Sequence, residues 1–538
     1  MSDAAYGGMR RFLSLGMVAL AWVGTVAAKP STLLYCSEGS PTTFNPALVT
    51  DGTTFDASSR AVFNRLIEFV PGTTQLQPGL AASWDIEDGG RRYVFHLRPH
   101  VPFHARGDFK PTRTFNADDV LFTFNRMRDK KHPYHHVSGG TYAYFDSMGF
   151  NELIRDIRKI DTHTVAFELA HPEAPFLADL AMDFASIHSA EYADFLLKRH
   201  TPEDLDRLPV GTGPFRMVRY VPDAMIRYEA FKDYWRKPPA IDRLVFLITP
   251  DAAVRWLKMR NHECHIMPYP NLAELETIRN TKGVRLLSAP GLNIGYLAFN
   301  VTKKPLDQPK VRLALALAMD QQAIIKAIYH DTAIPAAAAI PPSLWSHNKN
   351  LKPYPHDLQR ARTLLAKAGH PDGFSLSLWA MPVQRPYIPD ARRTAELIQA
   401  DWAKIGVKAH IVSYEWGEYL KRAALGEHDA ILMGWTGDNG DPDNFLGTLL
   451  SCSGVGTANN VARFCDPGYE SLIRQGRQET DQAKRAAIYG KAQVMLYQLV
   501  PWVPIAYAQV FMPMLEEVHG YRISPLGYHA FEEVTLQP

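Results

Sequence analysis

Hydrophobic and polar positions alternate along the first part of the chain. Such alternation, bounded by turn residues, predicts β-strands with one buried face. The predicted strands fall at 32–36, 84–87, 92–98, 164–169, 216–220, 225–228 and 243–248. A helix is expected at 57–68 and another from Asn116, which can cap it. The first part is therefore predicted to be rich in sheet, with an α+β region inside it.

From about residue 310, apolar positions follow a helical period and alternate with short apolar strands. The predicted helices are 311–329, 356–369, 391–405, 415–425 and 482–499, and the predicted strands are 374–379, 408–414 and 430–433. Strand–helix alternation predicts a parallel sheet. Ligands bind at the carboxyl ends of strands in such sheets. Two polar loops, at Arg385 and at Asp438, lie at these ends.

Length and composition limit the class of protein. A chain of 538 residues is expected to form two or three domains. Apolar residues make up 46% and charged residues 21%, which is typical of a soluble globular protein. The formal net charge of +2 gives no field that would favour nucleic acid. We therefore expect no nucleic-acid partner.

The amino terminus has the pattern of a signal peptide. Arg10 and Arg11 precede an apolar run at 12–26, and small residues follow up to Ala28. We predict cleavage after Ala28 and export of the mature chain. The apolar stretch 494–515 contains three prolines, which favours a buried crossing over a membrane span.

Four cysteines in an exported protein suggest two disulfides, with three possible connectivities. Cys452 and Cys465 flank a short loop and are predicted to pair locally, which leaves Cys36 for Cys264. Their spacings do not match zinc motifs.

The stretch 430–444 has the most informative chemistry. Its strand ends in a loop with an aromatic ring at Trp435, glycines that leave backbone amides open at Gly434 and Gly437, and three carboxylates. Asp438 lies nearest the strand end and is predicted to meet a small cationic group. The sequence predicts a cation site at this strand end.

Calcium is a weaker interpretation of these acids. The calcium-loop spacing fails, and Leu449 stands at the twelfth position, where glutamate is required. Asp441 and Asp443 are better explained as residues that shape the loop and cap the next helix. Arg385 can clamp both oxygens of a carboxylate. Together with Asp438 it offers one site for each charge of a free peptide or amino acid.

Other candidate chemistry is less specific. The loop Thr50-Asp51-Gly52 can present backbone amides to a ligand, or it can be a plain helix-capping turn. His132, His135 and His136 could ligate a metal or haem, but solvated loop histidines are the commoner case. Nucleophile-elbow, zinc-protease and Walker motifs are missing from the sequence, so a hydrolase has no motif in its favour.

Several motifs along nearly all the mature chain resemble the extracellular solute-binding family 5, and specifically its dipeptide binders. They are Leu34-Tyr-Cys-Ser-Glu-Gly-Ser-Pro41, Asn116-Ala-Asp-Asp-Val120, Ala174-Pro-Phe-Leu-Ala-Asp-Leu-Ala-Met-Asp-Phe-Ala-Ser186, Gly211-Thr-Gly-Pro-Phe215, Trp379-Ala-Met-Pro-Val-Gln-Arg-Pro-Tyr387 and Gly434-Trp-Thr-Gly-Asp-Asn-Gly-Asp-Pro-Asp-Asn444. The last two favour the dipeptide-binding subfamily.

The resemblance implies an α/β fold: a two-lobe periplasmic-binding-protein clamshell, type II or cluster C-like, with an extra α+β subdomain. The expected first lobe is 29–290 plus 509–538, with the subdomain at about 66–208, and the second lobe is 291–508. The resemblance also supports the same two disulfides. It implies a non-enzymatic, monomeric periplasmic component that delivers dipeptides to the membrane subunits of an ABC importer, with no cofactor or resident metal.

The resemblance also assigns the site. Asp438 would hold the peptide ammonium group and Arg385 the carboxylate, while Thr50 to Gly52 and Trp435, Thr436 and Gly437 would bind the peptide unit. Pro386, Tyr387 and Trp416 would line side-chain pockets. Asp51 stands where a small hydroxyl residue is expected, and an inward orientation would favour basic side chains.

Ligand length and ligand class follow from this assignment. A fixed spacing between Asp438 and Arg385 would measure peptide length, because a tripeptide would leave buried charges unpaired. Haem or glutathione carriage by a protein of the same family is the alternative, with haem as a transported ligand.

Overall fold

The computed structural model describes residues 30–537. The predicted signal peptide and its cleavage point lie outside these residues. Within residues 30–537, no helix has the length and apolarity needed to span a bilayer.

The first sheet lies beside the amino-terminal end of the described chain. Strand β1 (Thr32–Ser37) pairs in parallel with β10 (Arg243–Ile248), followed by antiparallel β9 (Met225–Ala230) and β8 (Phe215–Val221). A compact hydrophobic core lies around this sheet, and the Cys36–Cys264 disulfide is buried within it. The second predicted disulfide, Cys452–Cys465, is also present.

The helix predicted at 57–68 is wrong in its position. Helix α1 begins at Gly52 (Gly52–Thr54), because the Asp51 side chain accepts a hydrogen bond from the Thr54 amide at 2.8 Å. It continues as one π-helical turn to Ser59. Strand β2 (Ile67–Phe69) pairs with β3 (Leu76–Pro78), so tertiary pairing replaces helix at the end of the predicted segment.

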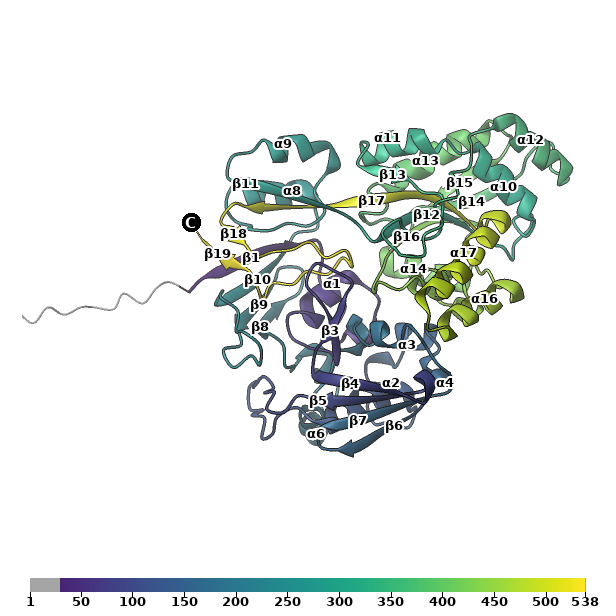
Figure 1. Ribbon diagram of the computed structural model, residues 1–538. Helices are drawn as coiled ribbons and strands as arrows, with labels where there is room; N and C mark the ends of the chain where they lie inside the picture. Colours follow the sequence, from purple (N-terminus) through teal and green to yellow (C-terminus); the bar gives the residue numbers. More distant parts are fainter. Residues whose placement is uncertain (1–29, 538) are drawn as a thin grey trace, which may run out of the picture.

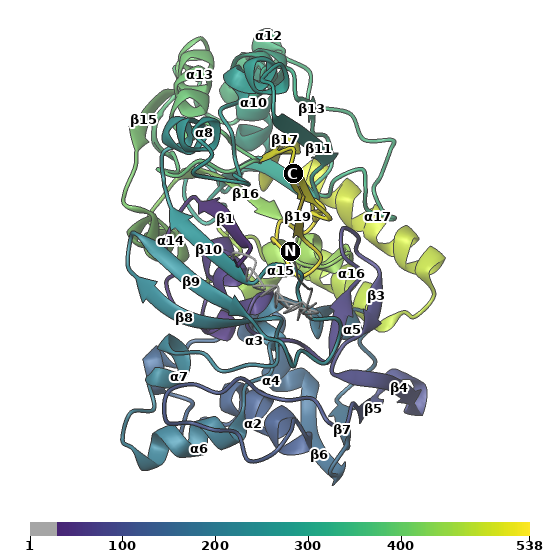
Figure 2. The same ribbon diagram turned by 90° about the vertical axis from the view of Figure 1, so that its left-hand side faces the viewer.

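A separate α+β layer follows, as predicted. Its antiparallel sheet has the order β4 (Ala81–Glu87), β5 (Arg92–Leu97), β7 (Thr164–Leu169) and β6 (Ile154–Asp161). Helix α2 (Ala117–Arg128) is capped by Asn116, as expected. Both views place this layer at the end of the molecule opposite helices α10, α12 and α13 (Figures 1 and 2). Its shorter helices, and those that connect it to the next sheet, are α3 (Ala143–Ser147), α4 (Phe150–Leu153), α5 (Phe176–Asp179), α6 (Ala190–Lys198), α7 (Asp204–Arg207), α8 (Ala252–Arg260) and α9 (Leu275–Arg279).

The largest sheet carries the loops at Arg385 and Asp438. Its strand order is β11 (Val284–Pro290), β17 (Trp502–Leu515), β12 (Asn293–Phe299), β16 (Ala430–Thr436), β14 (Ser375–Trp379) and β15 (Lys408–Val412), with β13 (Ala333–Pro335) also paired to β17. The predicted parallel pairing holds for β14 with β15 and β16. Strands β12 and β17 are antiparallel to their partners, because these crossings are not part of βαβ units.

The helices of this region cover the sheet. They are α10 (Pro309–Ala318), α11 (Gln321–Tyr329), α12 (Leu358–Lys367), α13 (Ala391–Ala403), α14 (Trp416–Leu425), α15 (Asp443–Leu450), α16 (Pro467–Gln478) and α17 (Gln482–Leu499). The single helix predicted at 311–329 is two helices, because Asp320 accepts a hydrogen bond from the Ala323 amide and starts α11 anew. Strands β18 (Val518–His519) and β19 (Thr535–Leu536) end the chain.

Strand β17 connects the two main cores. Its first half packs in the larger core, and Met512, Met514 and Leu515 pack in the smaller one. Figure 1 shows it running across the upper part of the molecule. This long crossing is the buried strand predicted from the prolines at 494–515. The numerical lobe boundaries stay a prediction.

Candidate functional site

One cavity, of about 150 Å³, collects most of the predicted site residues. Its walls come mainly from residues 38–56, 385–459 and 526–528, together with Tyr144, Asp183, Tyr269 and Tyr296, so distant parts of the chain meet there. Ten of the eleven predicted residues line it: Thr50, Asp51, Gly52, Arg385, Pro386, Tyr387, Trp416, Trp435, Thr436 and Asp438.

Asp438 follows strand β16 and faces this cavity. The Asn444 side chain holds its loop: the Asn444 carboxamide oxygen accepts from the Asp438 amide at 3.0 Å and from the Trp435 indole at 2.9 Å. The Asn444 amide also donates to the Asp438 carboxylate at 3.4 Å. Within residues 30–537, Asp438 forms no ion pair. Its charge is oriented but has no cationic partner.

The surroundings of Asp438 shift the pKa of its carboxyl group, and a bound cation would shift it further. Burial raises the pKa of Asp438 to about 7, and the nearby Asp183 carboxylate also raises it. Hydrogen bonds from Tyr144 and Asn444 act in the opposite direction and favour the charged form. A ligand ammonium group would further favour the carboxylate.

Arg385 provides the opposite charge in the same cavity. Its guanidinium lies over the Trp416 ring, 5.9 Å from the ring centroid, and donates to the Gln384 carbonyl at 3.2 Å. Burial alone would lower the pKa of Arg385, but Tyr387 and Glu38 outweigh it and raise the pKa. The described chain offers Arg385 no carboxylate within ion-pair distance. It can therefore accept a ligand carboxylate.

The two glycines of the loop have different roles. Gly434 lines the cavity, and a Cβ there would collide with the Tyr387 ring, so glycine permits the close approach of that ring. Gly437 does not line the cavity. Its amide donates to the Leu292 carbonyl at 2.7 Å, and a Cβ would meet Leu292 and Phe445 at 2.7 Å. The expectation that the Gly437 amide is open to ligand is therefore not met.

Asp51 has a structural role and also reaches the site. Its Oδ1 atom accepts from the Thr54 amide at 2.8 Å and from the Thr53 hydroxyl at 2.7 Å, which caps helix α1. It lines the first cavity and also a second, larger one of about 750 Å³ that lies on the Arg385 side. The capping-turn interpretation of the 50–52 loop is therefore confirmed, and its contact with a ligand stays a prediction for residues that line the cavity.

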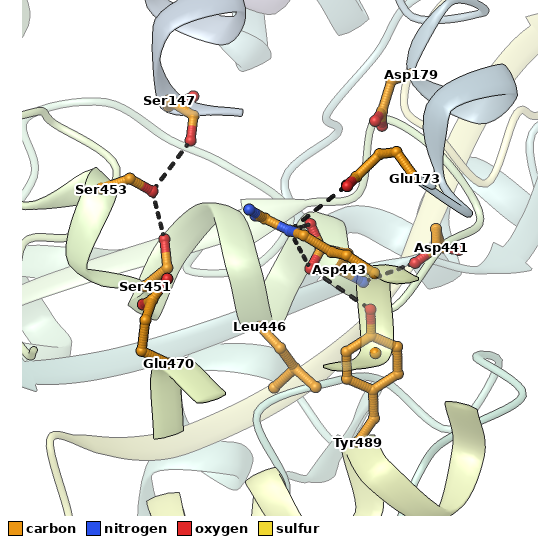
Figure 3. A network of polar contacts seen from close by, with 12 residues as sticks. Ser147, Glu173, Asp179, Asp441, Asp443, Leu446, Ser451, Ser453, Glu470 and Tyr489 are labelled. Atoms are coloured by element: carbon orange, nitrogen blue, oxygen red, sulfur yellow. Dashed lines mark hydrogen bonds and ion pairs between the residues drawn. The ribbon is translucent and has the colours of Figure 1, made fainter. Parts of the chain in front are cut away.

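The other two acids of the loop are paired within the protein. Both oxygens of Asp441 accept from Arg485, at 2.7 and 2.9 Å, and Asp443 accepts from Arg477 at 2.9 Å (Figure 3). The calcium interpretation has no support here, because arginines occupy these carboxylates. Asp441 and Asp443 shape the loop, as the sequence predicts.

The histidines of the 132–136 loop lie away from the cavity. His135 is buried and its Nδ1 atom bonds to the Arg126 carbonyl at 2.8 Å, and none of the three lines the cavity. No group of three or more potential metal-ligating side chains occurs in the chain from 30 to 537. These histidines offer no platform for haem in the cavity.

Several cavity residues escaped sequence analysis. They are Glu38, Phe55, Asp56, Tyr144, Asp183, Tyr269, Tyr296, Leu420, Met433, Ala458, Asn459, Leu526, Gly527 and Tyr528. Glu38 directly follows strand β1, so the strand-end argument used for Asp438 also applies to it. Tyr144, Asp183 and Asn459 have no local signal, because only tertiary folding brings their segments to the cavity.

Comparisons with known proteins identify the family of the chain. The family model described as "Bacterial extracellular solute-binding proteins, family 5 Middle" matches residues 75–457. The dipeptide-binding protein of Escherichia coli K12 is 53% identical over 525 residues, covering 98% of each chain. Heme-binding protein A of Haemophilus influenzae is 47% identical over 506 residues, covering 94% of this chain and 92% of that protein.

A solved structure has the same fold. The dipeptide-binding protein of Pseudoalteromonas sp. SM9913, in complex with Met-Leu, superposes with a TM-score of 0.90 at 39% identity, covering 94% of this chain and 100% of the other. The described fold is thus that of a family 5 periplasmic binding protein, as the sequence motifs predict. The chain belongs to the bacterial extracellular solute-binding proteins of family 5.

Proposed function

We propose that this protein binds dipeptides in the cavity between Asp438 and Arg385 and delivers them to the membrane subunits of an ABC importer. The observation that carries the proposal is that both side chains line one cavity and neither has an ion-pair partner in residues 30–537. A dipeptide brings one ammonium and one carboxylate group, so it supplies the missing partner of each.

The charge pairing explains why the ligand must have both termini free. A buried charge without a partner costs several kcal/mol, and a ligand that lacks one terminus leaves either Asp438 or Arg385 in that state. The Asp438 site holds the ammonium group with help from Tyr144, and Arg385 holds the carboxylate beside Tyr387 and Trp416. Backbone groups of Trp435 and Thr436 and of residues 50–52 contact the peptide unit.

Two relatives support the ligand class. The Escherichia coli relative is named a dipeptide-binding protein, and the Pseudoalteromonas structure holds a dipeptide. The predicted signal peptide, with cleavage after Ala28, supports export of the mature protein to the periplasm, and we propose that it acts there as a monomer. The lobes are 29–290 plus 509–538, with the inserted subdomain at 66–208, and 291–508.

Haem is a second candidate only because a 47% identical relative is named for it. The cavity volume of about 150 Å³ favours a small ligand, and no histidine lines it. Glutathione has an ammonium group and carboxylates but a longer backbone, so its carboxylate would not meet Arg385 in the same geometry.

The proposal is tested by a thermal-shift screen of the mature protein with Ala-Ala, Ala-Ala-Ala, glutathione and haem, followed by calorimetry. We expect Ala-Ala to raise the melting temperature most, and N-acetyl-Ala-Ala and Ala-Ala-amide to have little effect. A larger shift with haem or glutathione would overturn the proposal. Mass spectrometry after incubation should recover intact dipeptide, whereas hydrolysis products would indicate an enzyme.

A further inference from the structure

Asn459 is a cavity residue with an unused hydrogen-bonding group. Its side chain is 6% exposed and lines the same cavity as Asp438. The side-chain amide nitrogen is buried and has no acceptor anywhere in residues 30–537. An orphaned buried donor destabilises a protein, so such a group in a binding cavity points to a ligand acceptor.

The loop that carries Asn459 is firmly held. The Cys452–Cys465 disulfide closes it. Inside the loop, the Asn460 amide donates to the carbonyls of Ser451 and Phe464, both at 2.8 Å. The Asn459 backbone amide donates to the Thr457 hydroxyl at 3.1 Å. This loop, residues 452–465, therefore presents the Asn459 side chain from a fixed backbone.

Asn459 is linked to the ammonium end of the site through its loop. The Ser453 hydroxyl of this loop donates to the Ser147 carbonyl at 3.4 Å (Figure 3), and Ser147 ends helix α3, which carries Tyr144. Tyr144 hydrogen-bonds to Asp438, and Asp438, Tyr144 and Asn459 line the same cavity. This link favours a position of Asn459 near the first residue of the ligand.

We propose that Asn459 is a specificity-determining residue for the first side chain of the dipeptide, which it recognises through an oxygen acceptor. This inference rests on the proposed function. Acidic side chains are disfavoured there, because Asp183 and Asp438 line the same cavity. The preferred first residues are neutral ones with an oxygen acceptor, namely threonine, serine, asparagine and glutamine.

Calorimetry with matched ligands tests the proposal. Thr-Ala and Val-Ala have nearly the same shape and differ in one hydroxyl group. We expect the wild-type protein to bind Thr-Ala about tenfold more tightly than Val-Ala, the effect of one buried hydrogen bond. In Asn459→Leu, which keeps the side-chain size, this preference should disappear.

Reversed ligands give the internal control. Ala-Thr and Ala-Val place the same side chains at the carboxylate end, and their affinity ratio should not change in Asn459→Leu. The double variant Cys452→Ala/Cys465→Ala should weaken the Thr-Ala preference, because it frees the loop that holds Asn459. Circular dichroism verifies that each variant is folded.

The possible failures are distinguishable. The role of Asn459 would be overturned if the wild-type protein bound Thr-Ala and Val-Ala with equal affinity, as when water rather than the ligand satisfies the Asn459 amide. Binding of Ala-Ala in the same experiment would still uphold the proposed function. A preference that survives in Asn459→Leu would also overturn the role of Asn459. If Ala-Ala itself does not bind, the proposed function fails and the inference fails with it.

Discussion

Asp438 differs from its neighbours Asp441 and Asp443 in whether the protein supplies a cationic partner. Asp438 faces the cavity with no cationic partner in the described chain, and Arg385 waits for a carboxylate across the same space. Asp441 is paired with the buried Arg485, and Asp443 with the partly buried Arg477. We call Asp438 and Arg385 the incomplete group, because their charges lack a partner in the described chain. Asp441 and Asp443 form the completed group, because arginines of the protein pair with them.

The completed group also joins distant parts of the fold. Glu173 and Asp179, from the segment around α5, lie beside Asp441 and Asp443 (Figure 3). The Asn439 amide donates to Asp179 at 2.8 Å, and Arg477 lies 3.8 Å from Glu173. Burial raises the pKa of Glu173 to about 8. This network holds the loop rigid, so that its neighbour Asp438 is positioned for the ligand.

The largest expected effect comes from removing the charge of the incomplete group. Asp438→Asn keeps the shape but should weaken Ala-Ala binding by about 3–4 kcal/mol, or several hundred-fold, because the ligand ammonium loses its partner. Its melting temperature at neutral pH should not fall and should rise, since no internal ion pair is lost and a buried carboxylate with a raised pKa is removed. Calorimetry with near-normal affinity would refute the ammonium site.

Arg385→Met should affect both affinity and length selection. We expect about a hundredfold loss of Ala-Ala affinity, because the ligand carboxylate is buried without a partner. Ala-Ala-Ala should lose much less, so the ratio of dipeptide to tripeptide affinity falls. Unchanged discrimination between the two peptides, measured by calorimetry, would show that Arg385 does not set the length.

Asp441→Ala tests the completed group and should lower stability while it changes ligand binding little. The substitution leaves the buried Arg485 guanidinium without its bidentate carboxylate partner, so the free energy of unfolding should fall by about 3 kcal/mol. Ala-Ala affinity of the folded fraction should change less than tenfold. Urea unfolding measures the stability, and a variant as stable as the wild type would contradict the role given to this pair.

The smallest expected effect is the pH dependence of binding. Because the pKa of Asp438 is raised to about 7 in the free protein, its carboxyl group is protonated at lower pH and must lose that proton to hold an ammonium group. Ala-Ala affinity should therefore fall as the pH decreases below 7, by up to about tenfold per unit. Above about pH 8 it should fall again as the ligand amine loses its proton.

Stability should show the opposite trend for the same group. Between its ordinary value of 3.8 and about 7, Asp438 binds more protons in the folded than in the unfolded chain. The stability that it contributes is therefore present at low pH and lost as the pH rises through this window. In Asp438→Asn, both the acid limb of the binding curve and this slope should disappear.

The success of the sequence predictions differs by region for physical reasons. Strands β14, β15 and β16 and the position of Asp438 at a strand end follow from local pattern and from βαβ connectivity. The helix predicted at 57–68 failed because β2 pairs with β3 instead. The single helix predicted at 311–329 is divided into α10 and α11, because the side chain of Asp320 caps the start of the second helix.

The sequence alone determined which loops carry charge and which family motifs are present, because these depend on local pattern. The short spacing of Cys452 and Cys465 predicted their pairing, which left Cys36 for Cys264. The sequence also selected Asp438 among the three carboxylates, but only the tertiary structure decided which cations pair with the other two. Arg477 and Arg485 come from two separate helices and reach Asp443 and Asp441 but not Asp438. The bond of the Gly437 amide to the Leu292 carbonyl, and the absence of an acceptor for the Asn459 side-chain amide in residues 30–537, were likewise visible only in the tertiary structure, since hydrogen bonds and ion pairs depend on proximity in space.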